Sequence, residues 1–196
     1  MDVDLILTLL PFACIASFTP GPNNILVMTQ GIRQGLRSTL GYQLGAGLAC
    51  FAIPMVFFLL GAWLQNLLPS LVSIMKYVGC AYLLWLAWQV ATAKPGKGSG
   101  TRCTASFTTG FVLQFVNPKY YLFVATLTSV LITAAGNIVS MLGYSFIFSV
   151  LAVAGMFTWA AAGAVLQNFF LRWHIVVNAV MGLALLWSAW SVFQTQ

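Results

Sequence analysis

The stretch Phe18–Asn24 reads FTPGPNN and interrupts an apolar run that extends from about residue 5 to residue 28. Pro20 and Pro22 have no backbone N–H and clash with the preceding turn, so a helix must bend or unwind around Thr19 to Asn23. Backbone carbonyls without partners are costly in hydrocarbon, and irregular backbone persists there only where it is buried in protein or lines a wet cavity. The stretch therefore predicts a broken membrane helix beside a polar cavity.

The composition places this broken helix in a membrane protein. Of the 196 residues, 61% are hydrophobic and only 5% are charged, and the mean hydropathy is +0.95. A bilayer core of about 30 Å requires roughly 20 apolar residues of helix per crossing. Six stretches meet this requirement and leave no room for a soluble domain: residues 5–28, 40–64, 69–92, 106–133, 138–166 and 175–194. The predicted fold class is an all-α membrane protein with six transmembrane helices.

The basic residues predict the orientation of these helices. The loops after the first, third and fifth spans contain Lys or Arg, namely Arg33, Arg37, Lys94, Lys97, Arg102 and Arg172. The loops near 65–68 and 134–137 contain neither, so the positive-inside rule places the odd loops in the cytoplasm and both termini in the periplasm. Because the basic residues are scattered and form no patch with aromatic side chains, nucleic acid is not an expected partner.

The two halves of the chain are similar to each other. Three motifs recur in order at nearly one offset: LLWLAW at 83–88 and LLWSAW at 185–190, LGY at 40–42 and 142–144, and Pro20 with Pro118. Chance is the alternative, since Trp is enriched at membrane interfaces, but three ordered matches favour duplication. We expect a three-helix repeat at 1–95, a cytoplasmic linker at 96–105 and a second repeat at 106–196. An odd number of spans inverts the second repeat, and such transporters bind substrate near the midplane.

A second predicted break, Asn117-Pro118-Lys119, lies in the fourth span. A lysine near the centre of a span is costly and usually marks a substrate or ion path, and no span contains an acid to pair with Lys119. We expect Lys119 to receive a substrate carboxylate; the alternative is that it snorkels to the interface. Freed carbonyls and a helix start at the first break also suit the ammonium and carboxylate groups of a zwitterion.

The candidate binding residues follow from the two breaks: Thr19, Pro20, Gly21, Pro22, Asn23, Asn24, Asn117, Pro118 and Lys119. The intramembrane amides Gln43, Gln114 and Asn178 are candidates for lining a pathway, with interhelical hydrogen bonding as an equal alternative. The four cysteines show no metal-ligand spacing and are interpreted as packing residues, so no metal, cofactor or disulfide is expected. The chain also lacks paired acids or a nucleophile with a base, so no enzymatic activity is expected.

With both breaks placed, the sequence resembles the LysE/RhtB family of bacterial amino-acid exporters. The resemblance rests on TPGPNN at 19–24, AYLLWLAW at 81–88 and LQFVNPK at 113–119, and it covers essentially the whole chain. Within the family, the chain looks most like the exporters of cysteine and O-acetylserine. The resemblance implies efflux of small neutral amino acids across the inner membrane, driven by proton antiport.

The sequence is also compatible with three other functions. A passive channel or an importer for small zwitterions would use the same site, since the direction of transport cannot be read from residues. A non-transporting assembly subunit would contain the breaks only as packing features. The Gly-rich second and fifth spans also leave room for the contacts of a homodimer.

Overall fold

The computed structural model describes residues 3–92, 106–115, 117, 120–121, 123–124, 138–166, 169 and 173–194. This part of the chain is helical and contains no strand. Its α-helices are α1 (Val3–Phe18), α2 (Pro22–Gln34), α3 (Leu40–Ala91), α4 (Phe107–Phe115), α6 (Ile138–Val165) and α8 (His174–Gln194), and a 3-10 helix, η1, covers Leu36–Thr39. The prediction of an all-α protein is confirmed.

The first predicted span contains two helices. Between α1 and α2, Thr19–Gly21 are not helical, and Gly21 precedes α2 in an extended conformation with φ −153° and ψ 174°. Pro22 is the first residue of α2, where its missing N–H and fixed φ are tolerated. The helix ends before Gly35, whose φ of +81° is a conformation that glycine adopts without steric penalty.

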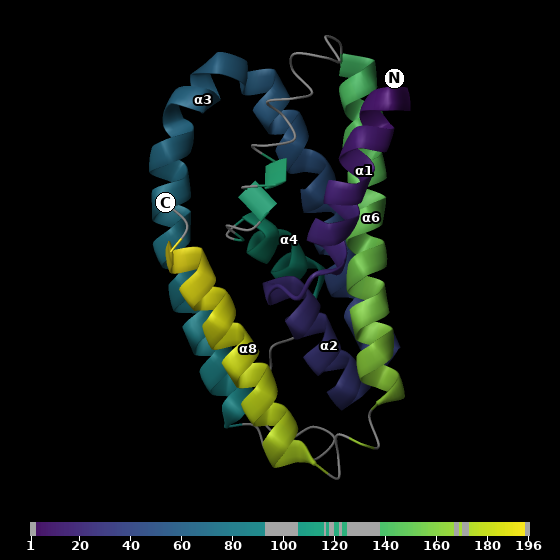
Figure 1. Cartoon of the computed structure of the whole chain (residues 1–196), viewed down its shortest axis with the longest axis vertical. Helices are drawn as coiled ribbons and strands as arrows, with labels where there is room; N and C mark the ends of the chain where they lie inside the picture. The colour runs from purple at the N-terminus through teal and green to yellow at the C-terminus, as the bar shows by residue number, and fades with distance from the viewer. Residues whose placement is uncertain are drawn as a thin grey trace.

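The second and third predicted spans lie in one helix. The sequence predicts a loop near 65–68, but α3 remains helical over 52 residues. At about 1.5 Å per residue this helix is more than twice as long as a bilayer core is thick. Its ribbon turns over at one end of the molecule, so that its two limbs run in opposite directions (Figure 1). The expected spans are thus the two limbs of a bent helix.

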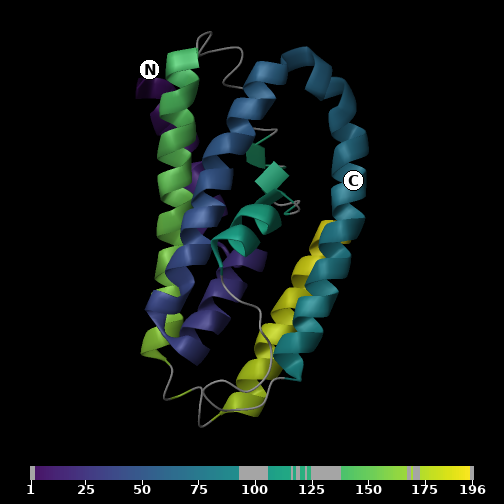
Figure 2. The ribbon, with the colours of Figure 1, turned by 180° about the vertical axis from the view of Figure 1, so that it is seen from behind.

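The helices pack against two long helices, α3 and α6, which also contact each other. Helices α1 and α2 pack against α6, α4 packs against α3, and α8 lies along the later limb of α3. In both ribbon views, α2 and α4 lie between α6 and the later limb of α3 (Figures 1 and 2). One buried apolar cluster surrounds α1 and the segment after α4, and a second surrounds α2 and α8. The non-helical residues 19–21 therefore separate two cores.

Two helical segments are long and apolar enough to cross a membrane, considering only the residues that the structure describes: Leu36–Leu60 and Ile138–Val165. Large apolar side chains are also exposed along α6 and α8, including Phe146, Val150, Val180 and Trp187. An exposed apolar surface of this kind suits contact with lipid. The ends of α2, α3 and α6 that lead into the Lys- and Arg-containing loops lie at the same end of the molecule (Figure 1).

Some helix crossings are so close that only glycine fits. A Cβ atom on Gly45 of α3 would lie 2.0 Å from the carbonyl oxygen of Phe107 in α4. A Cβ atom on Gly155 of α6 would lie 2.4 Å from the carbonyl oxygen of Ser17 in α1. These close backbone contacts hold α4 against α3, and α1 against α6.

Candidate functional site

The end of α1 leaves four backbone carbonyls, those of residues 16–19, without the partners that a continuing helix would supply. Pro20 and Pro22 have no N–H with which to reach the carbonyls four residues earlier. A carbonyl that is shielded from water by protein or by lipid requires a donor from elsewhere. Side chains provide a donor for each of the four.

Asn24 donates hydrogen bonds to two of these carbonyls. Its Nδ2 donates to the carbonyl oxygen of Ser17 at 2.8 Å and to that of Thr19 at 2.9 Å. An amide nitrogen carries two hydrogens, so both donors of Asn24 are used within the break. Asn24 therefore fastens the start of α2 to the end of α1.

The other two carbonyls accept hydrogen bonds from Thr19 and Trp159. Thr19 Oγ1 donates to the carbonyl oxygen of Ala16 at 3.3 Å, and Trp159 Nε1 of α6 donates to that of Phe18 at 3.0 Å. The sequence suggested that these freed carbonyls would be open to an ammonium group. Each carbonyl instead accepts a hydrogen bond within the protein, from Thr19, Asn24 or Trp159.

A cavity of about 70 Å³ lies beside this break. Its lining residues are Ala16, Ser17, Gly21, Pro22, Asn23, Asn24, Cys50, Gln114, Asn117, Tyr120, Phe123, Phe148, Ala152 and Met156. This volume is the space open to the centres of water molecules, and one water needs roughly 10–15 Å³ of it. The cavity therefore has room for about five to seven water-sized groups. It can thus hold a molecule the size of a small amino acid.

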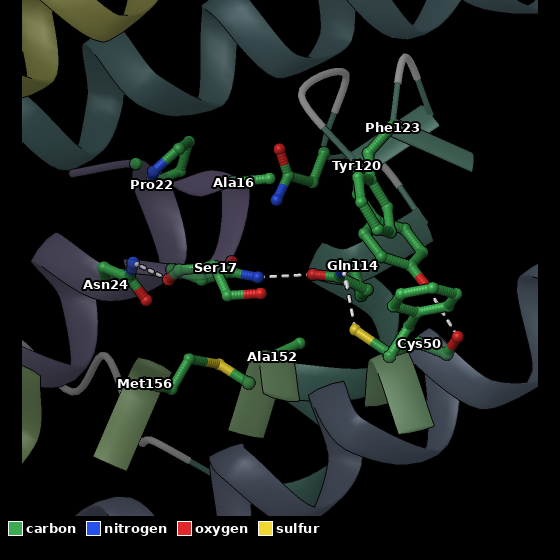
Figure 3. A pocket seen from close by; sticks show the side chains of 14 residues that line it. Ala16, Ser17, Pro22, Asn24, Cys50, Gln114, Tyr120, Phe123, Ala152 and Met156 are labelled. Carbon is green, nitrogen blue, oxygen red and sulfur yellow. Dashed lines mark hydrogen bonds between the residues drawn. The ribbon is translucent and has the colours of Figure 1, made fainter. Parts of the chain in front are cut away.

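A directional chain of hydrogen bonds crosses the cavity. Tyr42 OH donates to Asn23 Oδ1 at 2.8 Å, and Asn23 Nδ2 donates to Gln114 Oε1. Gln114 Nε2 in turn donates to Cys50 Sγ at 3.1 Å. Figure 3 shows Gln114 between the residues of the first break and Cys50. This series of hydrogen bonds joins α3, α2 and α4. It also determines whether the oxygen or the nitrogen of each side-chain amide faces its neighbour.

The segment after α4 closes the cavity on the side opposite the first break. Tyr120 OH donates to the carbonyl oxygen of Cys50 (Figure 3), and Asn117 is non-helical and only 9% exposed. The side chain of Asn117 lines the cavity, but its Oδ1 has no hydrogen-bond donor in the described part of the chain. A buried acceptor without a donor is uncommon in proteins and requires an explanation.

The remaining wall of the cavity is apolar. Phe123, Phe148, Ala152 and Met156 contribute hydrocarbon or thioether surface (Figure 3 labels all but Phe148). No lining residue among those that the structure describes has an Asp, Glu, Lys, Arg or His side chain. Polar recognition within this lining therefore depends on amides, hydroxyls, a thiol and backbone groups.

The structure brings together half of the candidate residues. Six of them line the cavity: Gly21, Pro22, Asn23, Asn24, Gln114 and Asn117. Thr19 and Pro20 lie in the break but outside the lining, while Gln43 donates to Thr39 Oγ1 at 2.8 Å and Asn178 lies on α8. Pro118 and Lys119 lie outside the residues that the structure describes. No group of three or more potential metal ligands occurs within the described ranges.

Sequence reasoning missed three polar residues that shape the cavity. The sequence predicts a packing role for Cys50 and does not point to Tyr42 or Tyr120 as site residues. No local signal distinguishes Cys50 from a core cysteine. Tyr42 did carry a signal, because it belongs to the repeated LGY motif. A tyrosine buried in a membrane span requires a hydrogen-bond partner, which Asn23 supplies.

A small amide-lined cavity beside a broken helix is the kind of site at which a membrane transporter can hold a small polar molecule. Residues 14–193 match the family model described as LysE type translocator. The chain belongs to this family.

The chain is also similar to curated relatives over nearly its whole length. It is 30% identical over 184 residues to the cysteine/O-acetylserine efflux protein of Escherichia coli (strain K12), which covers 93% of this chain and 94% of the relative. The protein of the same description from Salmonella typhimurium (strain LT2) is 28% identical over 183 residues, with the same coverage. No solved structure matches the chain.

Proposed function

We propose that this protein is a secondary transporter that exports small neutral amino acids or their derivatives, such as cysteine or O-acetylserine, from the cytoplasm. The observation that carries the proposal is the cavity lined by Asn23, Gln114 and Asn117, which come from the two predicted halves of the chain. Family membership and the curated relatives support export of amino-acid substrates. The protein would reside in the bacterial inner membrane with both termini in the periplasm.

The inverted-repeat arrangement is part of this proposal. If residues 102 positions apart are equivalent, Gly47 corresponds to Ser149. Ser149 Oγ donates to the carbonyl oxygen of Gly47 at 2.7 Å, so these two positions are in direct contact. Equivalent residues meet in this way near a two-fold axis. The packing of α1 and α2 on α6, and of α4 on α3, follows the same exchange of halves.

Lys119 has a proposed role as a cation that receives the substrate carboxylate together with the helix start at the first break. It follows Asn117 by two residues, and no predicted span contains an acid to neutralise it. A stably inserted Lys119→Ala variant should therefore lose export, and a Lys119→Arg variant should retain part of it. Unchanged export by Lys119→Ala would assign the lysine to the interface instead.

Proton antiport is the proposed driving reaction, and the basis for this proposal is the family resemblance. Proton relays usually contain Asp, Glu or His at depth, and the predicted spans contain none of these. Lys119, the amino group of the substrate or water would have to carry the proton, or Asp4 would do so from the edge. Efflux from vesicles with and without an imposed pH gradient tests this coupling, and indifference to the gradient would exclude it.

The principal experiment compares cells with and without the protein. Export predicts higher external and lower internal cysteine and O-acetylserine in the cells that contain it. Counterflow in proteoliposomes then separates a carrier from a channel, because only a carrier is stimulated by substrate on the opposite side. A structural subunit would change neither measurement, and an importer would reverse the first.

A further inference from the structure

The cavity must hold both charged ends of a zwitterion without a charged side chain among its described lining residues. The question is which groups face the carboxylate and which face the ammonium. Donors and acceptors that are already paired within the protein are less available to a ligand. The groups around the cavity that have no partner therefore indicate where each end of the ligand lies.

The donors lie at the start of α2. Gly21 precedes the helix without a side-chain cap, and Pro22 has no N–H to offer. The backbone N–H groups of Asn23 and Asn24 have no acceptor among the described residues, whereas the N–H of Ile25 reaches Gly21 at 2.9 Å. Both asparagines line the cavity. A helix start with unpaired N–H groups and a positive dipole end favours an anionic group.

At the first break, the carbonyls of residues 16–19 and of Gly21 already have donors. The carbonyls of residues 16–19 each accept from a side chain. Asn23 Oδ1 accepts from Tyr42, and Gln114 Oε1 accepts from Asn23. An ammonium group at any of these oxygens would share the acceptor with a donor that is already in place.

Asn117 differs from these groups because its acceptor is unpaired. Its side chain lines the cavity and is more than nine-tenths buried, and its Oδ1 has no donor within the described ranges. The terminal torsion of an asparagine is broad and roughly two-fold, so a rotation of the amide presents Oδ1 to the cavity. An ammonium group in the cavity would supply the missing donor and form a charge-assisted hydrogen bond.

We propose that Asn117 receives the ammonium group of the transported molecule and that the start of α2 receives its carboxylate. The bound amino acid then bridges the two predicted halves, with its side chain toward Phe123, Phe148 and Met156. The substrate class is a zwitterion with a small uncharged side chain. This inference rests on the proposed function and assigns a role within the same site.

The test compares three ligands that differ only in their charged ends. L-Cysteine has both groups, 3-mercaptopropionate lacks the ammonium, and cysteamine lacks the carboxylate. Binding to the purified full-length protein is measured by calorimetry in a reducing buffer. A hydrogen bond to a charged group changes affinity by roughly tenfold or more, so each analogue should bind the wild type at least about tenfold more weakly than cysteine.

Two variants then assign the ammonium group to Asn117. Asn117→Leu should weaken cysteine at least about tenfold and leave 3-mercaptopropionate within about twofold of its wild-type affinity. Asn117→Asp should tighten cysteamine, because a carboxylate attracts the ammonium more strongly than an amide does. Gln34→Leu, which removes an exposed amide at the end of α2, is the matched control and should change neither ligand.

The outcomes separate the two proposals. If the wild type binds cysteine but Asn117→Leu weakens cysteine and 3-mercaptopropionate equally, the role of Asn117 is overturned and the transport proposal stands. If Asn117→Leu fails to fold, Asn117→Asp decides, and unchanged cysteamine binding overturns the inference. If the wild type binds neither cysteine nor O-acetylserine and cells export neither, the proposed function fails and this inference fails with it.

Discussion

Asn23 of α2 donates its side-chain amide to Gln114 of α4, 91 residues further along the chain. The bond joins the two segments in which the sequence predicts interruptions, and both side chains line the cavity. Each amide is oriented by another residue, since Tyr42 donates to Asn23 and Gln114 donates to Cys50. A buried polar network is stable when all members are paired and is weakened when one is lost.

Replacing Asn23 by leucine should impair both folding stability and export. The substitution removes the acceptor that Asn23 provides for the Tyr42 hydroxyl and the donor that it provides for Gln114 Oε1. Each buried group that loses its partner costs about 1–3 kcal/mol. We expect a lower melting temperature and export reduced by at least about tenfold, measured as cysteine efflux from proteoliposomes. Wild-type efflux by this variant would place the transport path elsewhere.

A double-mutant cycle tests whether Asn23 and Gln114 act as a pair. The single variants Asn23→Ala and Gln114→Ala should each destabilise the protein, and the double variant should cost less than their sum. Directly bonded residues show coupling free energies of about 0.5–3 kcal/mol. Strict additivity of the unfolding free energies would mean that the two amides do not interact in the membrane.

Asn23 and Asn24 could be assigned to the cavity from the sequence because the effect of proline is local. Pro20 and Pro22 remove specific hydrogen bonds wherever they occur in a helix, so the adjacent amides Asn23 and Asn24 could be placed beside irregular backbone. Gln114 was less certain from sequence. An amide in a span serves equally well as a pathway residue or an interhelical bond, and this amide forms such a bond and lines the cavity as well.

The contributions of Cys50 and Trp159 could not be predicted because they depend on long-range packing. Trp159 lies 141 residues from the carbonyl that it pairs, and nothing near either residue indicates this contact. The continuity of α3 was missed for a different reason. Span length predicts how many residues cross the membrane, but it does not determine whether the connection between two spans unwinds or remains helical.

Tyr42→Phe should affect substrate binding more than folding. The variant keeps the buried ring of Tyr42 and removes only the hydroxyl that orients Asn23 Oδ1. Without that donor the Asn23 amide can rotate, and its bond to Gln114 becomes less populated. We expect the KM for cysteine efflux to rise by several-fold to about tenfold while the maximal rate changes less, since one hydrogen bond contributes about 1 kcal/mol. A change confined to the melting temperature would assign Tyr42 a packing role only.

Trp159→Phe tests the pairing of the break with α6. The variant removes the donor to the Phe18 carbonyl while keeping an aromatic ring. Phe18 is exposed in the structure, so its carbonyl would face lipid without a donor, and the loss should lower the free energy of unfolding by about 1–3 kcal/mol, measurable as a lower melting temperature. Trp187→Phe on α8 is the matched control, because Trp187 is 72% exposed and should tolerate the change. Equal effects of the two substitutions would contradict a specific role for the Trp159 indole.

Gly45→Ala should disturb the site from a distance by displacing α4. The new Cβ would lie 2.0 Å from the backbone oxygen of Phe107, the first residue of α4, and a backbone atom cannot move aside alone. Overpacking of this kind costs about 1–3 kcal/mol or more, and a shift of α4 carries Gln114 away from Asn23. The variant should therefore lose both thermal stability and cysteine efflux. Gly182→Ala provides the comparison, since its Cβ would lie 3.5 Å from the Ala91 side chain, an ordinary contact. Alanine is favoured over glycine within a helix by up to about 1 kcal/mol, so Gly182→Ala should be neutral or stabilising. If Gly45→Ala were also neutral or stabilising, α3 and α4 would not pack this closely in the membrane.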